Sequence, residues 1–413
     1  MEGILMYELF NAKLIYQTPD DASYFFGYYD KPSLKDNKLL THRVTFDGRD
    51  VRDGDVAEVG YIDLDTNNFI KVDETLAWNW QQGSQLQWLG SDRIIYNSIK
   101  DNRFISIIYN LKTNEKKIIP FAIYTIHPNK KEALGINYER FYWVRPGYNY
   151  QNIKNEKFRG FVVDDGIFKI DLESGEVKKI IDIKEILEIN RLKEFDNSYH
   201  WLEHMMYNPS GDRFIFFHRW RNTKENTRLY NAKSDGSDIV SFPDVRFYSH
   251  ACWKNEREFS IWARDFESGV VERFKQSNLR KILRPFYHLI KPLLPKKAVK
   301  SVGVRAKHYK MDSRFNYFED CFSDLLEVAK FGHQRWIGDN LLTDTYEDED
   351  SFRWLYFLDT KNQKFIPLAK FYSHYNESGY RCDLHPRVNG EFITIDSSHT
   401  KKRKQVILKV NDV

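Results

Sequence analysis

The stretch HMMYNPSGDRFIFFHRW at residues 204–220, followed by TRLYNAKSDGSDIVSF at 227–242, decides the fold. Two apolar runs flank the polar turn NPSGD, and a third run leads through another polar turn to a short fourth run. This order is typical of a four-stranded antiparallel unit, because aromatic and β-branched runs between turn residues favour strands. One such sheet cannot bury its own faces, so the pattern predicts further copies.

The same order recurs six more times along the chain. The first hairpins of these copies lie at residues 28–44, 85–99, 124–138, 249–264, 332–346 and 382–398. Several copies continue to a strand that ends in a D-L-x-T-like turn, as in GIFKIDLESGEVKKI at 166–180. We therefore predict an all-β fold, a seven-bladed β-propeller of four-stranded antiparallel blades that occupies residues 1–413 as a single domain. A β-sandwich or two small β domains is the alternative, and seven copies with one internal order argue against it.

The N-terminal segment KLIYQTP is expected to complete the last blade and so close the ring without an open edge. Two insertions interrupt the repeat. Residues 182–200 predict a short helix and loop before the fourth blade. Residues 272–312, within the fifth blade, form a basic amphipathic insertion in which Pro285 and Pro292 would break a helix. Within it, residues 279–300 are a candidate contact for an anionic membrane surface, and a solvated loop or a partner-binding arm is the alternative.

Composition narrows the function classes. The chain has 63 basic and 59 acidic residues, a formal charge of +4, and this balance gives no reason to expect nucleic-acid binding. Three cysteines form no even disulfide framework, and no leader or long apolar run is visible. We expect a cytoplasmic protein, with peripheral attachment at the inner membrane as the variant that the basic insertion suggests. Phosphate loops, nucleophile elbows and CxxC pairs are missing, so nucleotide, esterase and thiol chemistries have little support.

Histidines supply the main chemical signal. Five of the twelve sit just before the turn of a first hairpin: His127, His204, His250, His333 and His385. Innermost propeller strands line the central channel, so we expect these imidazoles on one ring, where they would suit a divalent metal or act as a base. The alternative is that each histidine caps its own hairpin. Gln334 and Cys252 are candidate additional ligands, although Cys252 and Cys382 also fit as small core residues.

Arginines and aromatic residues surround the predicted ring. The arginines Arg145, Arg219, Arg335 and Arg387 follow inner strands and can bind carboxylates bidentately. Tyr148 and Trp336 offer flat surfaces for sugar rings. Together these residues predict a site for an anionic saccharide.

The motifs HMMYNPSGDRFIFFHRW, SHACW, GHQRW…LLTDTY and CDLHPRV…ITIDSS resemble the propeller of oligogalacturonate lyase and related β-propeller polysaccharide lyases, including ulvan lyases. GYYDKPS, WNWQQGSQLQW and NYERFYWVRPGYNY resemble bacterial propeller proteins encoded with polysaccharide genes. The resemblance implies His204 as the base, with His250, His333 and His385 as ligands of a manganese ion, zinc being the alternative. The family's glutamine ligand stands three residues before a histidine, where this chain has Lys330, and Gln334 is the substitute candidate.

The chemistry that the resemblance implies is metal-assisted β-elimination on an acidic oligo- or polysaccharide. Arg219 or Arg387 would hold the uronate carboxylate, and Arg145, Tyr148, His127, Arg335 and Trp336 would bind the remaining sugar. Two other hypotheses stay open at this point. One is a membrane-associated role in the biosynthesis of bacterial surface polysaccharide, such as capsule, with a glycosyltransferase-like or trimming activity. The other is a non-catalytic propeller scaffold.

Overall fold

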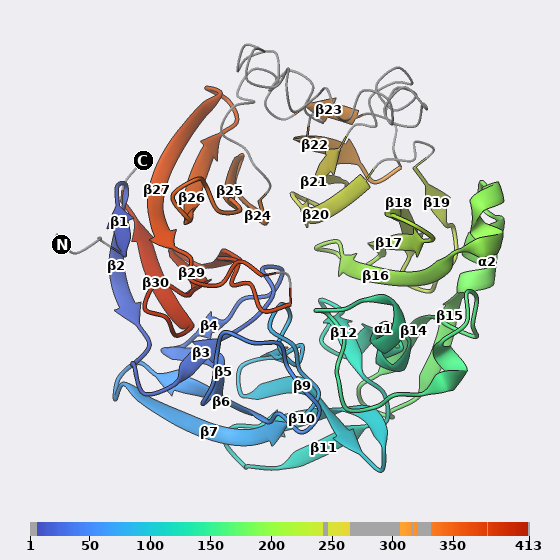
Figure 1. Cartoon of the computed structure of the whole chain (residues 1–413), viewed down its shortest axis with the longest axis horizontal. Helices are drawn as coiled ribbons and strands as arrows, with labels where there is room; N and C mark the ends of the chain where they lie inside the picture. The colour runs from blue at the N-terminus through green and yellow to red at the C-terminus, as the bar shows by residue number, and fades with distance from the viewer. Residues whose placement is uncertain are drawn as a thin grey trace, which may run out of the picture.

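The computed structural model describes residues 6–242, 247–264, 306–314, 318–320, 332–377 and 379–411. Seven antiparallel sheets surround a central axis, which confirms the predicted seven-bladed propeller (Figure 1). Apart from two N-terminal strands, the strands within each sheet follow chain order from the inside outward, and the sheets succeed one another around the ring.

The first three blades form the lower part of Figure 1. Blade 1 contains β3 (Ser23–Phe25), β4 (Leu34–Lys35), β5 (Lys38–Val44), β6 (Ala57–Asp63) and β7 (Asn68–Thr75). Blade 2 contains β8 (Gln87–Trp88), β9 (Arg93–Lys100), β10 (Arg103–Asn110) and β11 (Lys116–Ile119). Blade 3 contains β12 (Ile123–Ile126), β13 (Glu132–Gly135), β14 (Gly166–Asp171) and β15 (Val177–Asp182).

The remaining blades continue around the ring. Blade 4 contains β16 (Tyr199–Tyr207), β17 (Arg213–Arg221), β18 (Glu225–Lys233) and β19 (Val240–Ser241). Blade 5 contains β20 (Phe247–Trp253), β21 (Glu258–Arg264), β22 (Ala306–Asp312) and β23 (Phe318–Asp320). Blade 6 contains β24 (Gln334–Ile337), β25 (Asn340–Asp344), β26 (Phe352–Asp359) and β27 (Lys364–Tyr372). Blade 7 contains β28 (Arg387–Asn389), β29 (Phe392–Ser397) and β30 (Lys404–Val410).

N-terminal strands complete the last two blades. β2 (Ala12–Gln17) pairs with β30 as the fourth strand of blade 7, which confirms the predicted closure. β1 (Tyr7–Leu9) pairs with β27 and adds a fifth strand to blade 6. The ring is therefore closed by hydrogen-bonded ladders between the two ends of the chain, and each ladder covers a strand edge that would otherwise be open.

The recurring turn between the third and fourth strands has a local cause. Asp171 accepts hydrogen bonds from the backbone N–H groups of Glu173 and Ser174, and Asp359 does the same in blade 6. This side-chain bond supports the turn in place of a ladder bond, which explains why aspartate recurs there. At the tips of other hairpins, paired positive φ angles such as those of Asp101 and Asn102 match the twist of the flanking strands.

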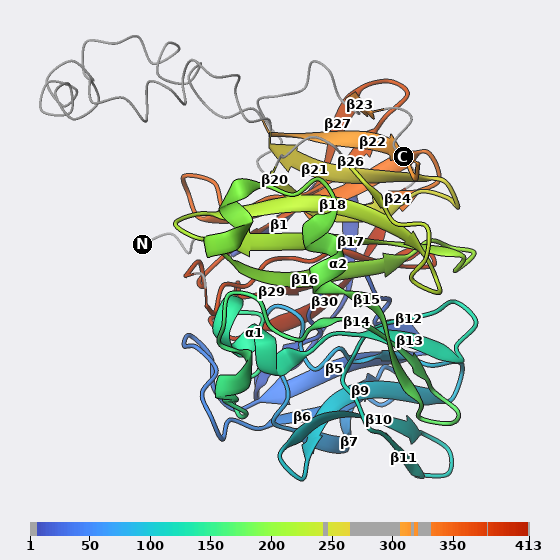
Figure 2. The ribbon, with the colours of Figure 1, turned by 90° about the vertical axis from the view of Figure 1, so that its right-hand side faces the viewer.

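Helical segments lie in the two long connections of blades 3 and 4. The predicted insertion before blade 4 contains α2 (Ile183–Glu188) and the 3-10 turn Lys193–Asn197, and Asp182 and Glu185 form a capping box on α2. A helix that the sequence did not predict, α1 (Tyr138–Val144), follows β13 and lies at one end of the channel (Figure 2). Among the described residues no helix is long and apolar enough to cross a membrane.

The described part of the predicted basic insertion is not an insertion. Ala306–Asp312 forms β22, which pairs with β21, so the boundary at residue 312 is too late. Residues 279–300, the candidate membrane contact, lie outside the described residues.

Candidate active site

The four histidines of blades 4 to 7 occupy one structural position. His204, His250 and His385 all have positive φ, at 56°, 49° and 46°. In blades 4 and 5 the pairing of the first two strands shifts register at the histidine. A bulge of this kind turns a side chain out of the sheet, and a non-glycine residue in this conformation is strained. The inner strands therefore bear a local cost that directs three imidazoles toward the channel.

The imidazoles of His250, His333 and His385 meet at the axis. The ring centre of His333 lies 4.1 Å from that of His250 and 4.2 Å from that of His385. All three side chains are buried. Burial lowers the pKa of His250 and of His385 well below its ordinary value, and His333 adds to this effect in both. His250 and His385 are therefore neutral near pH 7 and keep lone pairs for a cation.

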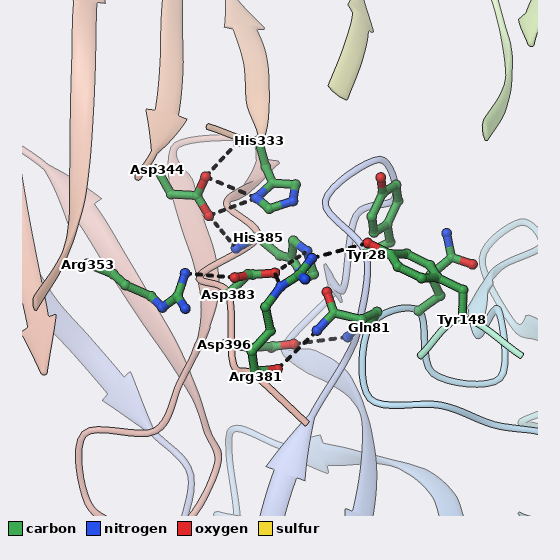
Figure 3. A network of polar contacts seen from close by, with 12 residues as sticks. Tyr28, Gln81, Tyr148, His333, Asp344, Arg353, Arg381, Asp383, His385 and Asp396 are labelled. Atoms are coloured by element: carbon green, nitrogen blue, oxygen red, sulfur yellow. Dashed lines mark hydrogen bonds and ion pairs between the residues drawn. The ribbon is translucent and has the colours of Figure 1, made fainter. Parts of the chain in front are cut away.

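The proton on His333 can be placed from its partner. Its Nδ1 lies 3.0 Å from both carboxylate oxygens of Asp344 (Figure 3). A carboxylate only accepts hydrogen bonds, so Nδ1 carries the hydrogen and Nε2 keeps its lone pair. This Nε2 is buried and has no hydrogen-bond partner among the described residues.

The residues present fit a divalent metal. Besides His333 Nε2, the buried atoms His385 Nε2 and His250 Nδ1 have no hydrogen-bond partner in the described part of the chain. Possible ligand atoms of His333, His385 and Asp383 lie within 4.8 Å of one another. Buried polar atoms without partners are costly, and imidazole nitrogens beside a carboxylate suit manganese or zinc. Asp383 was not predicted as a ligand.

His204 belongs to a separate chain of contacts. Its Nε2 is hydrogen-bonded to the Tyr28 hydroxyl, and its Nδ1 lies 3.2 Å from Glu203 Oε1. Burial lowers the pKa of His204, against the opposing effect of Glu203, and burial raises the pKa of Tyr28 well above its ordinary value. Tyr28 is therefore a neutral phenol that donates to Nε2, and the basic nitrogen of His204 is Nε2.

A cavity of about 300 Å³ opens beside His204 and His250. It is lined by predicted and unpredicted residues together: Arg145, Tyr148, His204, Arg219, Glu225, Phe247, Ser249, His250, Trp262, Tyr346 and Arg381. Arg145 and Tyr148 directly follow α1, so the cavity lies at the end of the channel where α1 is seen in Figure 2. The size is that of a small-ligand pocket with several polar groups facing one space.

Two of the predicted arginines are held by carboxylates. Arg145 lies 2.8 Å from Glu203 and 3.3 Å from Glu225, and Arg219 also pairs with both glutamates. Burial alone would raise the pKa of Glu203, but Arg145 and Arg219 lower it well below its ordinary value. Glu203 is therefore ionised, and both guanidinium groups are already engaged by carboxylates of the protein.

Arg381 is differently placed. Its Nε lies 2.6 Å from Asp383, and a terminal nitrogen contacts the Tyr148 hydroxyl at 3.3 Å. Asp383 also pairs with Arg353 at 2.7 Å (Figure 3). Burial would raise the pKa of Asp383, but Arg381 and Arg353 lower it well below the ordinary range. The guanidinium group of Arg381 thus connects the cavity to the histidine cluster.

Four residues predicted as catalytic or substrate-binding do not line this pocket. His127 begins the turn of its hairpin instead of preceding it, and its Nε2 is 2.9 Å from the carbonyl of Gly211 in blade 4. Arg387 is fully buried against Asp396 at 2.7 Å and Gly27. Trp336 packs beside Leu341 and Leu358 at the hairpin. Arg335 interacts with buried Cys252. We correct the positions expected of these residues accordingly.

Gln334 lies next to the metal cluster but points elsewhere. Its amide nitrogen donates to the backbone carbonyl of His250, while its Oε1 has no partner among the described residues. Because successive strand residues face opposite sides, Gln334 and His333 diverge. Its described contact holds the bulge of blade 5. Lys330 falls outside the described residues.

Several residues of the site carried no prediction, although the sequence motifs contain them. Tyr28 stands in GYYDKPS, Asp344 in LLTDTY, and Asp383 in CDLHP. Arg381 precedes the last motif by one residue. The signal available was the repetition of aspartate at the end of a second strand, in LLTDTY and ITIDSS. What no repeat indicates is that the loop after β3 places Tyr28 across the axis, with its ring centre 5.2 Å from that of His385.

Comparisons with solved structures support the fold. An oligogalacturonate lyase from Vibrio parahaemolyticus matches with a TM-score of 0.64 at 15% identity, over 98% of this chain and 97% of that chain. An oligogalacturonate lyase in complex with manganese matches with a TM-score of 0.64 at 15% identity, over 96% and 92% of the two chains. The propeller domain of the Trilobed protease from Pyrococcus furiosus matches with a TM-score of 0.53 at 9% identity, over 95% and 94%. No family model and no curated protein sequence matches the chain. At these identities the likeness concerns the propeller fold.

Proposed function

We propose that the protein is a metal-assisted lyase that cleaves uronic-acid-containing oligosaccharides by β-elimination. The observation that carries this proposal is the joint presence of a buried imidazole base, His204, and a metal-type cluster beside one arginine-lined cavity. The neighbouring fold of oligogalacturonate lyase, one example of which is in complex with manganese, supports the same class. An acidic oligosaccharide is the proposed substrate class.

His204 is the proposed base. Its lowered pKa keeps it neutral near pH 7, and Glu203, 3.2 Å from Nδ1, would stabilise the imidazolium once a proton arrives. In the proposed step the substrate replaces the Tyr28 hydroxyl at His204 Nε2, which takes the proton from the carbon next to the carboxylate. A carbon–carbon double bond forms, and the glycosidic C–O bond breaks. The imidazolium then returns the proton to the leaving oxygen, so substrate and products balance without another reactant.

His250, His333 and His385, with Asp383 beside them, would hold the metal ion. A bound divalent ion supplies a Lewis acid that stabilises the negative charge developing on the uronate carboxylate. The protein's own contribution is to keep His250 and His385 neutral and to orient all three imidazoles in a buried space. Manganese is the ion that the solved neighbour suggests, and zinc is also compatible with the ligand types.

Arg381 is the proposed carboxylate clamp, in place of Arg387. It lines the cavity and retains partial exposure of 18%, whereas Arg219 is 2% exposed and held by two glutamates. Tyr148, whose hydroxyl contacts Arg381, would pack against the sugar. Arg145 and Arg219 would then act mainly by fixing Glu203 behind His204.

The test is turnover of oligogalacturonate and of ulvan fragments by protein loaded with Mn²⁺ or Zn²⁺, followed by the ultraviolet absorbance of the unsaturated product. We expect an unsaturated product from at least one uronide, and its loss in His204→Ala. Saturated products, or equal turnover by wild type and H204A, would refute the proposal. Thermal unfolding of both proteins separates loss of chemistry from loss of fold.

A further inference from the structure

Asp344 connects two of the proposed metal-holding histidines, which come from different blades. Its Oδ1 accepts a hydrogen bond of 2.6 Å from the backbone N–H of His333, and its Oδ2 accepts one of 3.0 Å from the backbone N–H of His385. The same two oxygens receive His333 Nδ1 (Figure 3). The carboxylate is 2% exposed, so water does not compete for these bonds.

The backbone part of this arrangement repeats around the ring. At the matching place on the second strand, Asp396 of blade 7 accepts from the N–H of Gly27 in blade 1 at 3.0 Å. Asn97 of blade 2 accepts from the N–H of Ile123 in blade 3 at 2.9 Å. A polar side chain on one blade thus satisfies the inner-strand backbone of the next blade. We call this contact the blade strap.

Asp344 has a feature that the other straps lack. Asp396 also accepts a hydrogen bond from Arg387. Asn97 also accepts one from Ser106 and donates one to the Tyr150 hydroxyl. Within the described residues, Asp344 is the strap residue that also receives a ring nitrogen of its own blade. That bond fixes the His333 tautomer, while the backbone bonds fix where both imidazoles begin.

We propose that Asp344 is a positioning residue for the metal site, which orients His333 and sets the spacing between His333 and His385. The proposal rests on the metal site of the proposed function. A carboxylate behind a ligating imidazole typically changes metal affinity 10–100-fold when it is removed. The residue acts through the two histidines and is not itself a ligand.

The experiment measures Mn²⁺ and Zn²⁺ affinity of the full chain by calorimetry, for wild type, Asp344→Asn and Asp344→Ala. Asn97→Ala is the matched control, because it removes a blade strap far from the cluster. We expect about a 10–100-fold loss of affinity in D344N, which keeps the side-chain shape, and at least as large a loss in D344A. N97A is expected to lose stability and keep the wild-type affinity.

A spectroscopic measurement isolates the orienting role. In ¹⁵N spectra of the imidazoles, His333 should be protonated at Nδ1 in wild type and should lose this fixed tautomer in D344N. If wild type binds metal and D344N binds equally well, the inference is wrong while the proposed metal site stands. If wild type binds neither ion, the metal site itself fails. If N97A and D344A lost metal affinity equally, the loss would come from the missing blade strap and not from the bond between Asp344 and His333, and the inference would be wrong.

Discussion

Blades 4 to 7 and blades 1 to 3 place different chemistry at the same position of the inner strand. The first group brings His204, His250, His333 and His385 to the axis beside an open cavity. In the second group the matching places hold Gln85, whose positive φ of 57° is like that of the histidines, and Tyr124. The same positive-φ backbone conformation therefore occurs in both groups of blades, and the type of side chain decides whether the position belongs to the candidate site or to the packed interior.

In blades 1 to 3 the matching side chains are hydrogen-bonded to other neutral groups. Gln85 donates to the Tyr138 hydroxyl at 3.0 Å, and Gln82 donates to Tyr124 at 2.9 Å. Tyr138, the first residue of α1, stacks on Tyr150 with ring centres 4.1 Å apart. Gln85 Oε1 has no hydrogen-bond partner among the described residues either, but imidazole is the far commoner ligand for a transition-metal ion. The difference shows how a pseudo-symmetric ring acquires one asymmetric site.

The largest expected effect is the loss of turnover when the proposed base in blade 4 is removed. His204→Ala should lower kcat/KM for an accepted uronide by about 10²–10⁴-fold, because a positioned base contributes that much. Gln85→Ala, at the same inner-strand position, should leave the rate within a few-fold and lower the Tm instead. Rates and thermal unfolding of both variants measure this. Comparable rate losses in the two would mean that the halves do not differ in function.

The next effect concerns metal content. His385→Ala should abolish stoichiometric binding of Mn²⁺ or Zn²⁺, because a ligand atom is lost, and chelation of wild-type protein should reduce turnover in parallel. Tyr124→Phe, in blade 3, should keep one ion per chain. Elemental analysis after dialysis gives the answer for each protein. Retention of a full equivalent by H385A would remove His385 from the site.

A smaller effect is expected at the proposed clamp. Arg381→Lys keeps the positive charge but loses the guanidinium fork, so KM should rise roughly tenfold with little change in kcat, since a charge-assisted bond contributes about 1.5–3 kcal/mol. Steady-state kinetics on the acidic oligosaccharide, with the inhibition constant of its carboxyl-reduced, neutral analogue as a competitive inhibitor, separate this effect. A neutral substrate analogue should respond much less to the substitution. An equal response to both would argue against a carboxylate contact at Arg381.

A distributed effect on stability, with no direct effect on turnover, is expected from histidines away from the pocket. Burial lowers the pKa of His42, His200 and His399 to about 4. Above the unfolded value near 6.5 they are neutral in both states. As pH falls from about 6.5 toward 4, only the unfolded chain takes up these protons, so stability should fall by up to about 1.4 kcal/mol per pH unit for each group. Denaturant unfolding of metal-free protein from pH 7 to pH 5 measures the slope.

The blades could be predicted because each repeat carries its own turn chemistry and strand pattern, and the N-terminal strand could be assigned because blade 7 lacked a partner. The structure brings the histidines of blades 4 to 7 together, and their roles as base and metal ligands stay predictions. His127 does not join them, because only counting around the bulge shows that this residue begins the turn. Arg387 failed for a different reason. Its partner Asp396 is on the neighbouring strand, and one sequence does not show which arginines are neutralised.

The contributions of Tyr28 and Arg381 come from tertiary placement. Both lie on connections outside the inner strands, where no periodicity constrains direction. Asp344 lies between these cases. Its repeat position could be found in the sequence, but its simultaneous contact with two histidines depends on the spacing of adjacent blades.

The pairing of β2 with β30 has a consequence for biogenesis. The ribosome makes β2 before the strands of blades 1 to 6, and its partner strand β30 follows only after them. During the interval the nascent ring stays open, with β2 waiting as an unpaired edge that neighbouring chains could capture. Chaperone demand should therefore peak late in translation, and a circular permutant whose new ends fall between two other blades should shift it.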